Sequence, residues 1–346
     1  MDPLKDQYTN LLPSYNSALA NIKKLLETLL SLEKITVHTV QGRVKGVDSF
    51  LQKAEDYKDP FLEITDYIGL RVICYITSDV EKVCKIIERE FDIDKARSVN
   101  KTSGLGIDRV GYESVHYIAK LKADRASLPE YIFMKDYVFE VQIRTILQHT
   151  WAEIEHDRNY KFSGIIPDSI KRRFNILSGT LELVDREFDR LAAEIDKYKK
   201  QTKKEVSENN YKLEITTASL IEYFAKKADK NLLSRNSLDI LDKKSEEIIN
   251  EMHCFGISTL SDFAILDEKV SKEVRFKSWS HYTIIGYIRD CMIFDDAQKY
   301  FNKAWKGQWS AITRDMNSFL KEKGINFYAM VNQYKKSKSE KELFDL

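Results

Sequence analysis

The segment VFEVQIRT, residues 138–145, combines an apolar pattern with three polar side chains in one row. Successive side chains of an extended strand point to opposite faces, so Glu140, Gln142 and Arg144 share a face. A carboxylate can act as a general base, and a guanidinium can bind a phosphate through two parallel hydrogen bonds. Taken alone, the row is typical of a solvated face of a sheet, and a catalytic strand face is the alternative interpretation.

A second acid lies beside another apolar strand, in ITDYIGLRVICYI at residues 64–76. Asp66 comes just before this strand and Arg71 just inside it. Mg²⁺ is bound by one or two carboxylates together with substrate phosphates, so Asp66 is a candidate metal ligand. Arg71 could stack on a base or bind a phosphate. The alternative is a capping aspartate followed by a surface arginine.

The basic segment GRVKGVDSFLQK, residues 42–53, contains three cations and a hydroxyl: Arg43, Lys45, Ser49 and Lys53. Ser49 and Lys53 share a helical face because they are four residues apart. Such a group near a helix start suits a polyphosphate, although GxxxxGK[ST] is absent from the sequence. A solvated basic turn is the alternative.

The motif GYESVHY, residues 111–117, places Tyr112, Ser114 and His116 on one face of a predicted strand. Tyr112 offers a stacking platform for a base, and His116 offers a hydrogen-bond donor to a phosphate or a sugar. A purely structural Tyr–His face is the alternative.

These candidates need a scaffold, and the hydrophobic pattern predicts one. The predicted elements are helices at 10–33, 78–91 and 146–160, a turn with a short helix at 42–57, and strands at 69–76, near 93–100, at 114–121 and at 137–145. Alternating strands and helices with one antiparallel pair indicate a mixed sheet covered by helices. The glycine-containing segment 101–111 is predicted to be a loop that could move over a site.

A long helix is predicted from Pro167 onward, because apolar residues recur there in alternating steps of four and three. The stripe consists of Ile170, Phe174, Leu177, Leu181, Val184, Phe188, Leu191, Ile195 and Tyr198. It could form a dimer seam or a spine that packs on the sheet and the next domain. The polar stretch 199–210 is the predicted boundary, and residues 211–346 read as helical, with Trp279, Trp305 and Trp309 as anchors.

The composition describes a globular protein without a strong overall field. Of the 346 residues 43% are hydrophobic and 32% charged, and the net charge is +1, so recognition of an anion must be local. The segment MDPLKDQYTN lacks the pattern of a signal peptide, and no apolar run approaches the roughly 20 residues of a membrane span. We expect a cytoplasmic protein that does not bind membranes, with four reduced core cysteines.

Taken in order, RVKGVDSFLQK, DYIGLR, GYESVHY, EVQIRT and WAEIEHDRNYK resemble the successive motifs of the RelA/SpoT family synthetase domain. The resemblance covers roughly residues 10–195. It implies an α+β fold with a nucleotidyltransferase-like mixed sheet of the DNA polymerase beta type, within a synthetase domain at 1–200 that includes the long helix 168–200. An all-α domain at 211–346 would then have a regulatory or interaction role.

The resemblance also implies an activity: transfer of the β,γ-pyrophosphate of ATP to the ribose 3′-hydroxyl of GDP or GTP, which makes the alarmone (p)ppGpp. Asp66 and Glu140 match the catalytic acids and the Mg²⁺ site. The ATP-binding positions would be Arg43, Lys45, Ser49, Lys53 and Arg71, with Arg43 and Arg71 clamping adenine. The acceptor-binding positions would be Tyr112, His116, Gln142, Arg144, His156 and Lys161.

The segment GIDRVGY departs from the family pattern beside the acceptor site, where family members often carry a proline and a Lys or Asn. Three functions therefore remain open. The leading prediction is a GTP pyrophosphokinase, the second is a toxin-like enzyme that modifies the 3′ end of tRNA, and the third is a catalytically silent nucleotide sensor. A homo-oligomer is compatible with each of them.

Overall fold

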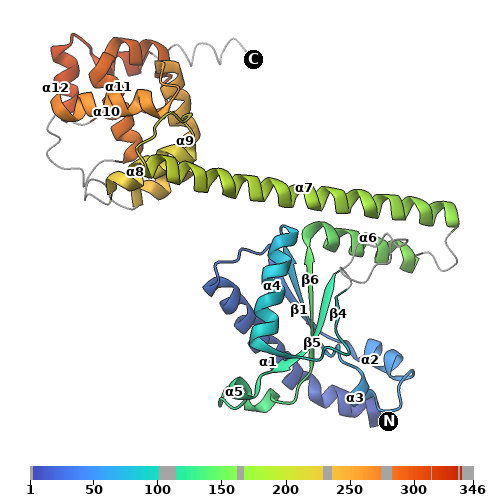
Figure 1. Ribbon diagram of the computed structural model, residues 1–346. Helices are drawn as coiled ribbons and strands as arrows, with labels where there is room; N and C mark the ends of the chain where they lie inside the picture. Colours follow the sequence, from blue (N-terminus) through green and yellow to red (C-terminus); the bar gives the residue numbers. More distant parts are fainter. Residues whose placement is uncertain are drawn as a thin grey trace. The chain divides into compact units, whose positions relative to one another are not determined.

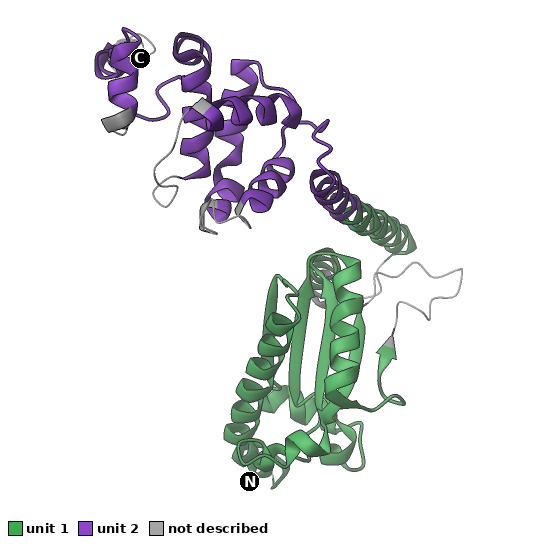
Figure 2. Cartoon of the chain, turned by 60° about the vertical axis from the view of Figure 1, so that its left-hand side comes forward, with its two compact units in different colours: residues 1–193 green, residues 194–346 purple. Residues whose placement is uncertain are grey.

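The computed structural model describes residues 3–100, 114–161, 167–228, 236–273, 283–312, 314–333 and 336. The chain divides into two compact units, residues 1–193 and 194–346 (Figure 2). In the first part of the chain the elements are α1 (Pro3–Leu32), β1 (Thr39–Val44), α2 (Val47–Ala54), α3 (Pro60–Glu63), β2 (Ile68–Cys74), α4 (Thr77–Glu90), β3 (Phe91–Ile93), β4 (Val99–Asn100), β5 (Val115–Leu121), α5 (Ala123–Ala126), the 3₁₀ helix η1 (Ile132–Met134), β6 (Phe139–Thr145) and α6 (Ile146–Lys161).

The six strands form one mixed sheet in the order β1-β2-β6-β5-β3, with β4 also paired to β5 (Figure 1). β2 and β6 are parallel, whereas the other pairs are antiparallel. The predicted mixed sheet with flanking helices is therefore confirmed. The parallel strands β2 and β6 are neighbours, so Arg71 on β2 and Asp66 just before it lie next to the strand that carries Glu140.

Helices α1 and α4 cover one face of the sheet. On α1 the apolar residues Ile22, Leu25, Leu26 and Leu29 recur at helical spacing and are buried in the core of this unit. The sheet contributes alternate residues to the same core, such as Val141 on β6. The intervening polar residues therefore face away from α1 and α4.

Helix α1 also fixes the basic segment. Tyr8 stacks on Phe50 of α2 with ring centroids 4.0 Å apart, and its hydroxyl donates to the Lys45 carbonyl at 2.7 Å. These contacts hold in place the short link between β1 and α2, which contains Lys45.

Three predicted elements need correction. Residues 42–44 belong to strand β1 rather than to a turn, because pairing with β2 imposes an extended conformation on a polar segment. The first helix begins at Pro3, seven residues earlier than predicted, with proline in its first turn. The strand predicted near 93–100 is two short strands, β3 and β4.

The long helix α7 (Asp168–Ser207) is confirmed, and it continues through most of the polar stretch predicted as a boundary. Two acids near the middle of α7 contact the sheet and α4. Asp185 accepts a hydrogen bond from Thr145 Oγ1 at 2.6 Å, and Asp189 accepts one from the backbone N–H of Ser78 at 2.8 Å. Asp189 therefore caps the N-terminus of α4 from a distant part of the sequence.

The apolar stripe of α7 is largely exposed. Leu177, Val184, Phe188 and Leu191 are each exposed by more than a third, whereas Ser178 of the same helix is buried. Phe174 is the stripe residue that packs edge-on against Trp151 of α6. The described residues of α7 therefore do not form a spine that is buried along its whole length.

The second unit is helical, as predicted. Its further elements are α8 (Thr217–Ala228), α9 (Asn236–Phe255), α10 (Leu260–Glu273), α11 (Ile284–Lys299), the π-helix η3 (Tyr300–Ala304) and α12 (Arg314–Glu322). Trp305 lies in the core of this unit and Trp309 packs against it, whereas Trp279 is outside the described residues.

The cysteines only partly follow the expectation of core thiols. Cys74 and Cys291 are buried and Cys84 is half-buried, but Cys254 is exposed near the end of α9. The expectation was wrong for Cys254, because it lies on the solvent-facing side of an amphipathic helix. None of the described helices is long and apolar enough to span a membrane.

Candidate active site

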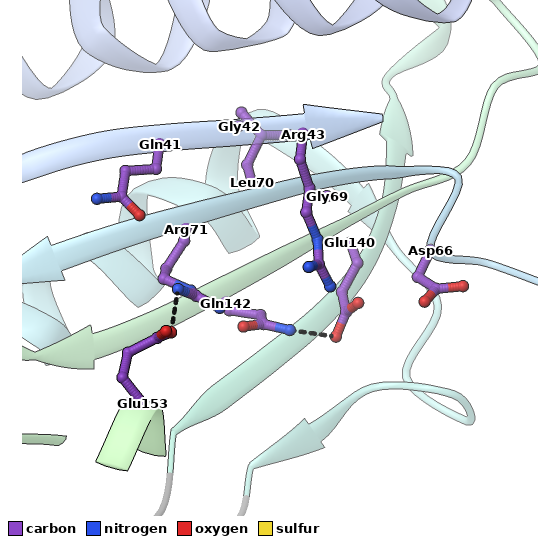
Figure 3. Close-up of a pocket in the computed structure, with 10 residues that line it drawn as sticks. All are labelled: Gln41, Gly42, Arg43, Asp66, Gly69, Leu70, Arg71, Glu140, Gln142 and Glu153. Carbon is purple, nitrogen blue, oxygen red and sulfur yellow. Dashed lines mark hydrogen bonds and ion pairs between the residues drawn. The ribbon is translucent and has the colours of Figure 1, made fainter. Parts of the chain in front are cut away.

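A cavity of about 200 Å³ opens on the face of the sheet that α1 and α4 leave uncovered (Figure 3). It is lined by Gln41, Gly42, Arg43, Asp66, Gly69, Leu70, Arg71, Glu140, Gln142 and Glu153. Glu140 and Gln142 of the polar row predicted on β6 thus belong to the cavity wall, whereas Arg144 does not line it. The two sequence motifs that carry Asp66 and Glu140 meet there.

The strand register brings the polar residues of three strands into line. Arg71 on β2 pairs with Gln41 on β1 and with Gln142 on β6, and these three residues form one row across the sheet. Residues directly opposite on neighbouring strands lie within side-chain reach of one another. The row continues to His116 on β5, which pairs with Gln142.

A second row runs beside the first, from Arg43 through Gly69 to Glu140. Gly69 has no side chain, so the space between Arg43 and Glu140 stays open. Figure 3 shows the Arg43 side chain extending into this space toward Glu140. The glycine of the DYIGLR motif thus shapes the floor of the cavity.

Asp66 is held by two lysines from the basic segment. Lys45 Nζ donates to Oδ2 at 2.7 Å, and Lys53 Nζ donates to Oδ1 at 3.0 Å. Burial raises the pKa of Asp66, but the two lysines outweigh it, and the net pKa is below the ordinary value. Asp66 is therefore an ionised carboxylate between two cations at neutral pH.

Glu140 is held by donors from its own strand and from β5. His116 Nδ1 lies 2.9 Å from Oε1, and Gln142 Nε2 donates to the same oxygen at 3.2 Å. Burial raises the pKa of Glu140 and the nearby Asp66 raises it further, but the hydrogen bonds from His116 and Gln142 bring the net value below the ordinary one. The carboxylate is therefore ionised at neutral pH.

Arg144 extends the polar row to the end of β6. It is buried, and its Nη2 donates to Gln142 Oε1. Its Nε has no hydrogen-bond partner within the described part of the chain. Burial, and then repulsion from Arg71, lower the pKa of Arg144 to about 10. This guanidinium keeps its charge at neutral pH and has a donor to spare for an anion.

The sequence interpretation missed Gln41 and Glu153 at the other end of the cavity, and His149 beside Glu153. Glu153 on α6 accepts a hydrogen bond from Arg71 Nη1 at 2.8 Å, and His149 Nδ1 lies 3.8 Å from the same oxygen. Burial, and then Arg71, lower the pKa of His149 below the ordinary value. Glu153 lay within a quoted motif, but its pairing with a residue 82 positions earlier depends on how α6 leaves the sheet.

The remaining predicted site residues divide into two groups. Ser49 is exposed on α2, one turn before Lys53, and does not line the cavity. Tyr112 and loop 101–111 lie outside the described residues, as do the side chains of His156 and Lys161, although the backbone of both belongs to α6.

The carboxylates suit a metal ion that arrives with a nucleotide. No group of three or more His, Cys, Asp or Glu that could hold a metal occurs among the described residues. Asp66 and Glu140 are a two-carboxylate set, and Mg²⁺ in phosphate-transfer sites is bound by one or two carboxylates plus substrate phosphates. The residues therefore fit a divalent cation that shares its ligands with a bound polyphosphate.

Residues 42–165 match the region found in RelA / SpoT proteins. These residues are a RelA/SpoT region. The matched range contains every cavity residue but Gln41. The family resemblance drawn from the ordered motifs is thereby confirmed.

Two curated proteins of Bacillus subtilis (strain 168) are similar to the half of the chain that holds the RelA/SpoT region. GTP pyrophosphokinase YjbM is 29% identical over 202 residues, which are 55% of this chain and 90% of that protein. GTP pyrophosphokinase YwaC is 26% identical over 167 residues, which are 46% of this chain and 75% of that protein.

Two solved structures match this chain with a comparable sequence identity. The small alarmone synthetase 1 from Bacillus subtilis is 29% identical, with a TM-score of 0.46, and the match covers 56% of this chain and 99% of that one. A GTP pyrophosphokinase family protein from Streptococcus pneumoniae is 26% identical, with the same TM-score, and the match covers 56% and 96%.

Proposed function

We propose that the chain is a pyrophosphokinase that transfers the β,γ-pyrophosphate of ATP to the ribose 3′-hydroxyl of GDP or GTP. The observation that carries the proposal is the cavity in which Asp66 and Glu140 lie together with Arg43 and Arg71. Phosphoryl transfer needs positioned cations around the transferred group and an acid–base group at the nucleophile, and this cavity has both. The two similar GTP pyrophosphokinases support the same reaction.

The donor phosphates would bind at the Asp66 end. Lys45 and Lys53 form ion pairs with the Asp66 carboxylate. Donor phosphates would draw these lysines, with Arg43, and Ser49 would be a further donor one turn before Lys53 on α2. Asp66 would then be released to hold a divalent cation, which we take to be Mg²⁺, with Glu140 as a second ligand. When bound, the cation would offset negative charge on the transferred phosphates.

Glu140 would act on the acceptor as the general base. Its pKa is below the ordinary value, so the carboxylate is free of a proton at neutral pH and can take the proton of the 3′-hydroxyl. The bond from O3′ to the β-phosphorus forms while the bond from the β-phosphorus to the α,β-bridging oxygen breaks. AMP leaves with the electron pair of that bond, and the pyrophosphate remains on the acceptor.

The acceptor would lie on the β5 side of Glu140. His116 lies there on β5, Gln142 and Arg144 follow Glu140 along β6, and the spare Nε donor of buried Arg144 suits an acceptor phosphate. Tyr112, His156 and Lys161 are proposed to complete this side, with Tyr112 stacking on the base. The net charge of +1 adds nothing in favour of a nucleic-acid acceptor, and we favour a free guanine nucleotide over the 3′ end of tRNA.

The two hydrophobic cores support different roles for the two parts of the chain. We assign catalysis to the synthetase domain 1–200 and a regulatory or recruiting role to 211–346. The described catalytic candidates all belong to the sheet unit, whereas the core of the helical unit is built from separate residues between Val206 and Val331.

The test is to incubate the protein with γ-labelled ATP and Mg²⁺, and to offer GDP, GTP and bulk tRNA as separate acceptors. We expect label on GDP or GTP, with none when Asp66→Asn replaces the wild-type protein. Label on tRNA alone would replace the proposed acceptor with the second prediction. Label on none of the three would overturn the catalytic assignment in favour of a nucleotide-binding protein.

A further inference from the structure

The cavity has two chemically different ends (Figure 3). Asp66, with its two lysines, lies at one end, and Gln41, Arg71 and Glu153 lie at the other. Cations that suit a polyphosphate gather at the Asp66 end. If the donor phosphates bind there, as the proposed function requires, the base of the donor nucleotide extends toward Arg71 and Glu153.

Glu153 fixes the orientation of Arg71. The hydrogen bond from Arg71 Nη1 to Glu153 Oε1, 2.8 Å long, engages the edge of the guanidinium plane. The faces of that plane remain for a base to stack on. Arg71 belongs to rigid strand β2 and Glu153 to α6, so two elements set the geometry together.

The same carboxylate keeps acceptor capacity for the base itself. An ionised carboxylate is an acceptor with two oxygens, and Arg71 binds one of them. The other oxygen can accept one hydrogen bond from a base stacked on Arg71. Adenine offers its exocyclic 6-amino group as a donor, whereas guanine has a 6-oxo acceptor at that position. Bidentate recognition of guanine through N1–H and its 2-amino group would need both carboxylate oxygens.

We propose that Glu153 determines the specificity of the donor site by accepting a hydrogen bond from the 6-amino group of adenine. This inference deepens the proposed function and depends on it for the identity of the donor. Glu153 acts in two ways: it holds the Arg71 plane and it selects a 6-aminopurine over a 6-oxopurine.

The substitution Glu153→Gln gives the sharpest test. Arg71 is a donor only, so it must take the carbonyl oxygen of the new amide, and the NH₂ group then faces the base. That arrangement opposes a 6-amino group, tolerates a hydrogen at position 6 and suits a 6-oxo group. The matched control is Glu155→Gln, which makes the same change two residues along α6 outside the cavity.

The probes are ATP, purine riboside triphosphate, which lacks the 6-amino group, and GTP as donor. For the wild-type protein and for Glu155→Gln we expect kcat/KM for ATP to exceed that for purine riboside triphosphate by about 10- to 100-fold, the range of a charge-assisted hydrogen bond. For Glu153→Gln this ratio should fall to about one, and use of GTP as donor should rise relative to ATP.

Two outcomes would overturn the inference. Wild-type protein could use both donors equally, which means that the amino group is not recognised. Glu153→Gln could lower kcat/KM for both donors by the same factor, which means that Glu153 only positions Arg71. Equilibrium binding of ATP and purine riboside triphosphate, measured by calorimetry, separates this inference from the proposed reaction. A difference in affinity that Glu153→Gln removes would support base recognition even if no acceptor became labelled.

Discussion

The Nδ1 atom of His116 lies 2.9 Å from Oε1 of Glu140, and the Nε2 atom of the same ring lies 2.7 Å from the Ser114 hydroxyl oxygen. A neutral imidazole can make both contacts by donating from Nδ1 and accepting the hydroxyl proton at Nε2. The Glu140 carboxylate only accepts, so the proton at Nδ1 is required by Glu140, and the Ser114 hydroxyl bonds the other ring nitrogen. The chain Ser114–His116–Glu140 thus links β5 to the carboxylate proposed as the base.

His116→Phe should move the acidic limb of the pH–rate profile to higher pH. The hydrogen bond from His116 lowers the pKa of Glu140, so its loss lets burial raise that pKa. Glu140 is competent as a base above its pKa, and competence is lost as the pH falls through it. The raised pKa therefore removes activity at a higher pH than in the wild-type protein. The measurement is kcat/KM for the acceptor between pH 4 and 8, in steps of about half a pH unit.

The control for this prediction is Lys120→Ala, on the same strand but exposed and outside the cavity. Its acidic limb should coincide with that of the wild-type protein. An unchanged limb in His116→Phe would mean that Glu140 does not set the acidic limb.

Asp66→Asn and Glu140→Gln should each reduce transfer by about 100-fold or more, the size of an acid–base contribution. Both keep the shape of the side chain and remove its charge. Circular dichroism and thermal unfolding should report a folded protein, because neither residue lies in the hydrophobic core of the sheet unit. Turnover within a few-fold of wild type at saturating Mg²⁺ would contradict the assignment of either acid.

Alanine substitutions at two glycines, where the added side chains would point to opposite faces of the sheet, should have different effects on ATP binding and on stability. A Cβ at Gly69 would lie 3.9 Å from Arg43 Cγ, an ordinary contact, but it would project into the cavity. A Cβ at Gly42 would come within 2.6 Å of Leu19 Cδ1 on α1. Gly69→Ala should therefore raise the KM for ATP without loss of stability.

Gly42→Ala should instead destabilise the protein by about 1 kcal/mol through overpacking, and leave the KM for ATP close to wild type. Urea unfolding and steady-state kinetics on both variants provide the check. Adding Leu19→Ala should relieve part of the cost in Gly42→Ala, since it removes the clashing atoms. Equal effects of the two glycine variants on KM would show that Gly69 does not shape the nucleotide site.

Local patterns predicted much of the sheet unit. The alternation in VFEVQIRT placed Glu140 and Gln142 on the cavity face, because the side-chain period of a strand is independent of its partners. The same reasoning missed β1, where Gln41, Gly42 and Arg43 have weak strand preference and pairing with β2 decides the conformation.

Long-range pairings could not be predicted from local pattern. The Arg71–Glu153 bond depends on the angle at which α6 leaves β6, and the Asp189 cap on α4 depends on where α7 crosses the sheet unit. The heptad spacing on α7 indicated the helix correctly, but spacing alone does not say which positions are covered. Ser178 is buried and Leu177, its neighbour, is exposed.

The helical unit contains a buried aspartate, and loss of its lysine partner should measurably lower the free energy of unfolding. Asp267 is 1% exposed and accepts hydrogen bonds from the hydroxyls of Tyr223 and Tyr287 and from Lys227. Lys227 also lies over both tyrosine rings, at 5.2 and 5.9 Å from their centroids. Burial, together with the charge of Asp267, raises the pKa of both tyrosines. This cluster connects α8, α10 and α11.

Lys227→Met should destabilise the protein by roughly 3 kcal/mol, because it leaves the Asp267 carboxylate buried with neutral donors alone. The control is Lys272→Met, which removes the partner of Glu268 on the same helix as Asp267. Both members of that pair are exposed, at 73% and 69%, so its loss should cost less than about 0.5 kcal/mol. Urea unfolding followed by circular dichroism measures both changes.

Because Lys227 lies outside the sheet unit, transfer at 25 °C should persist in Lys227→Met as long as the sheet unit stays folded. Equal stability of the two variants would mean that the tyrosine hydroxyls alone compensate the buried charge.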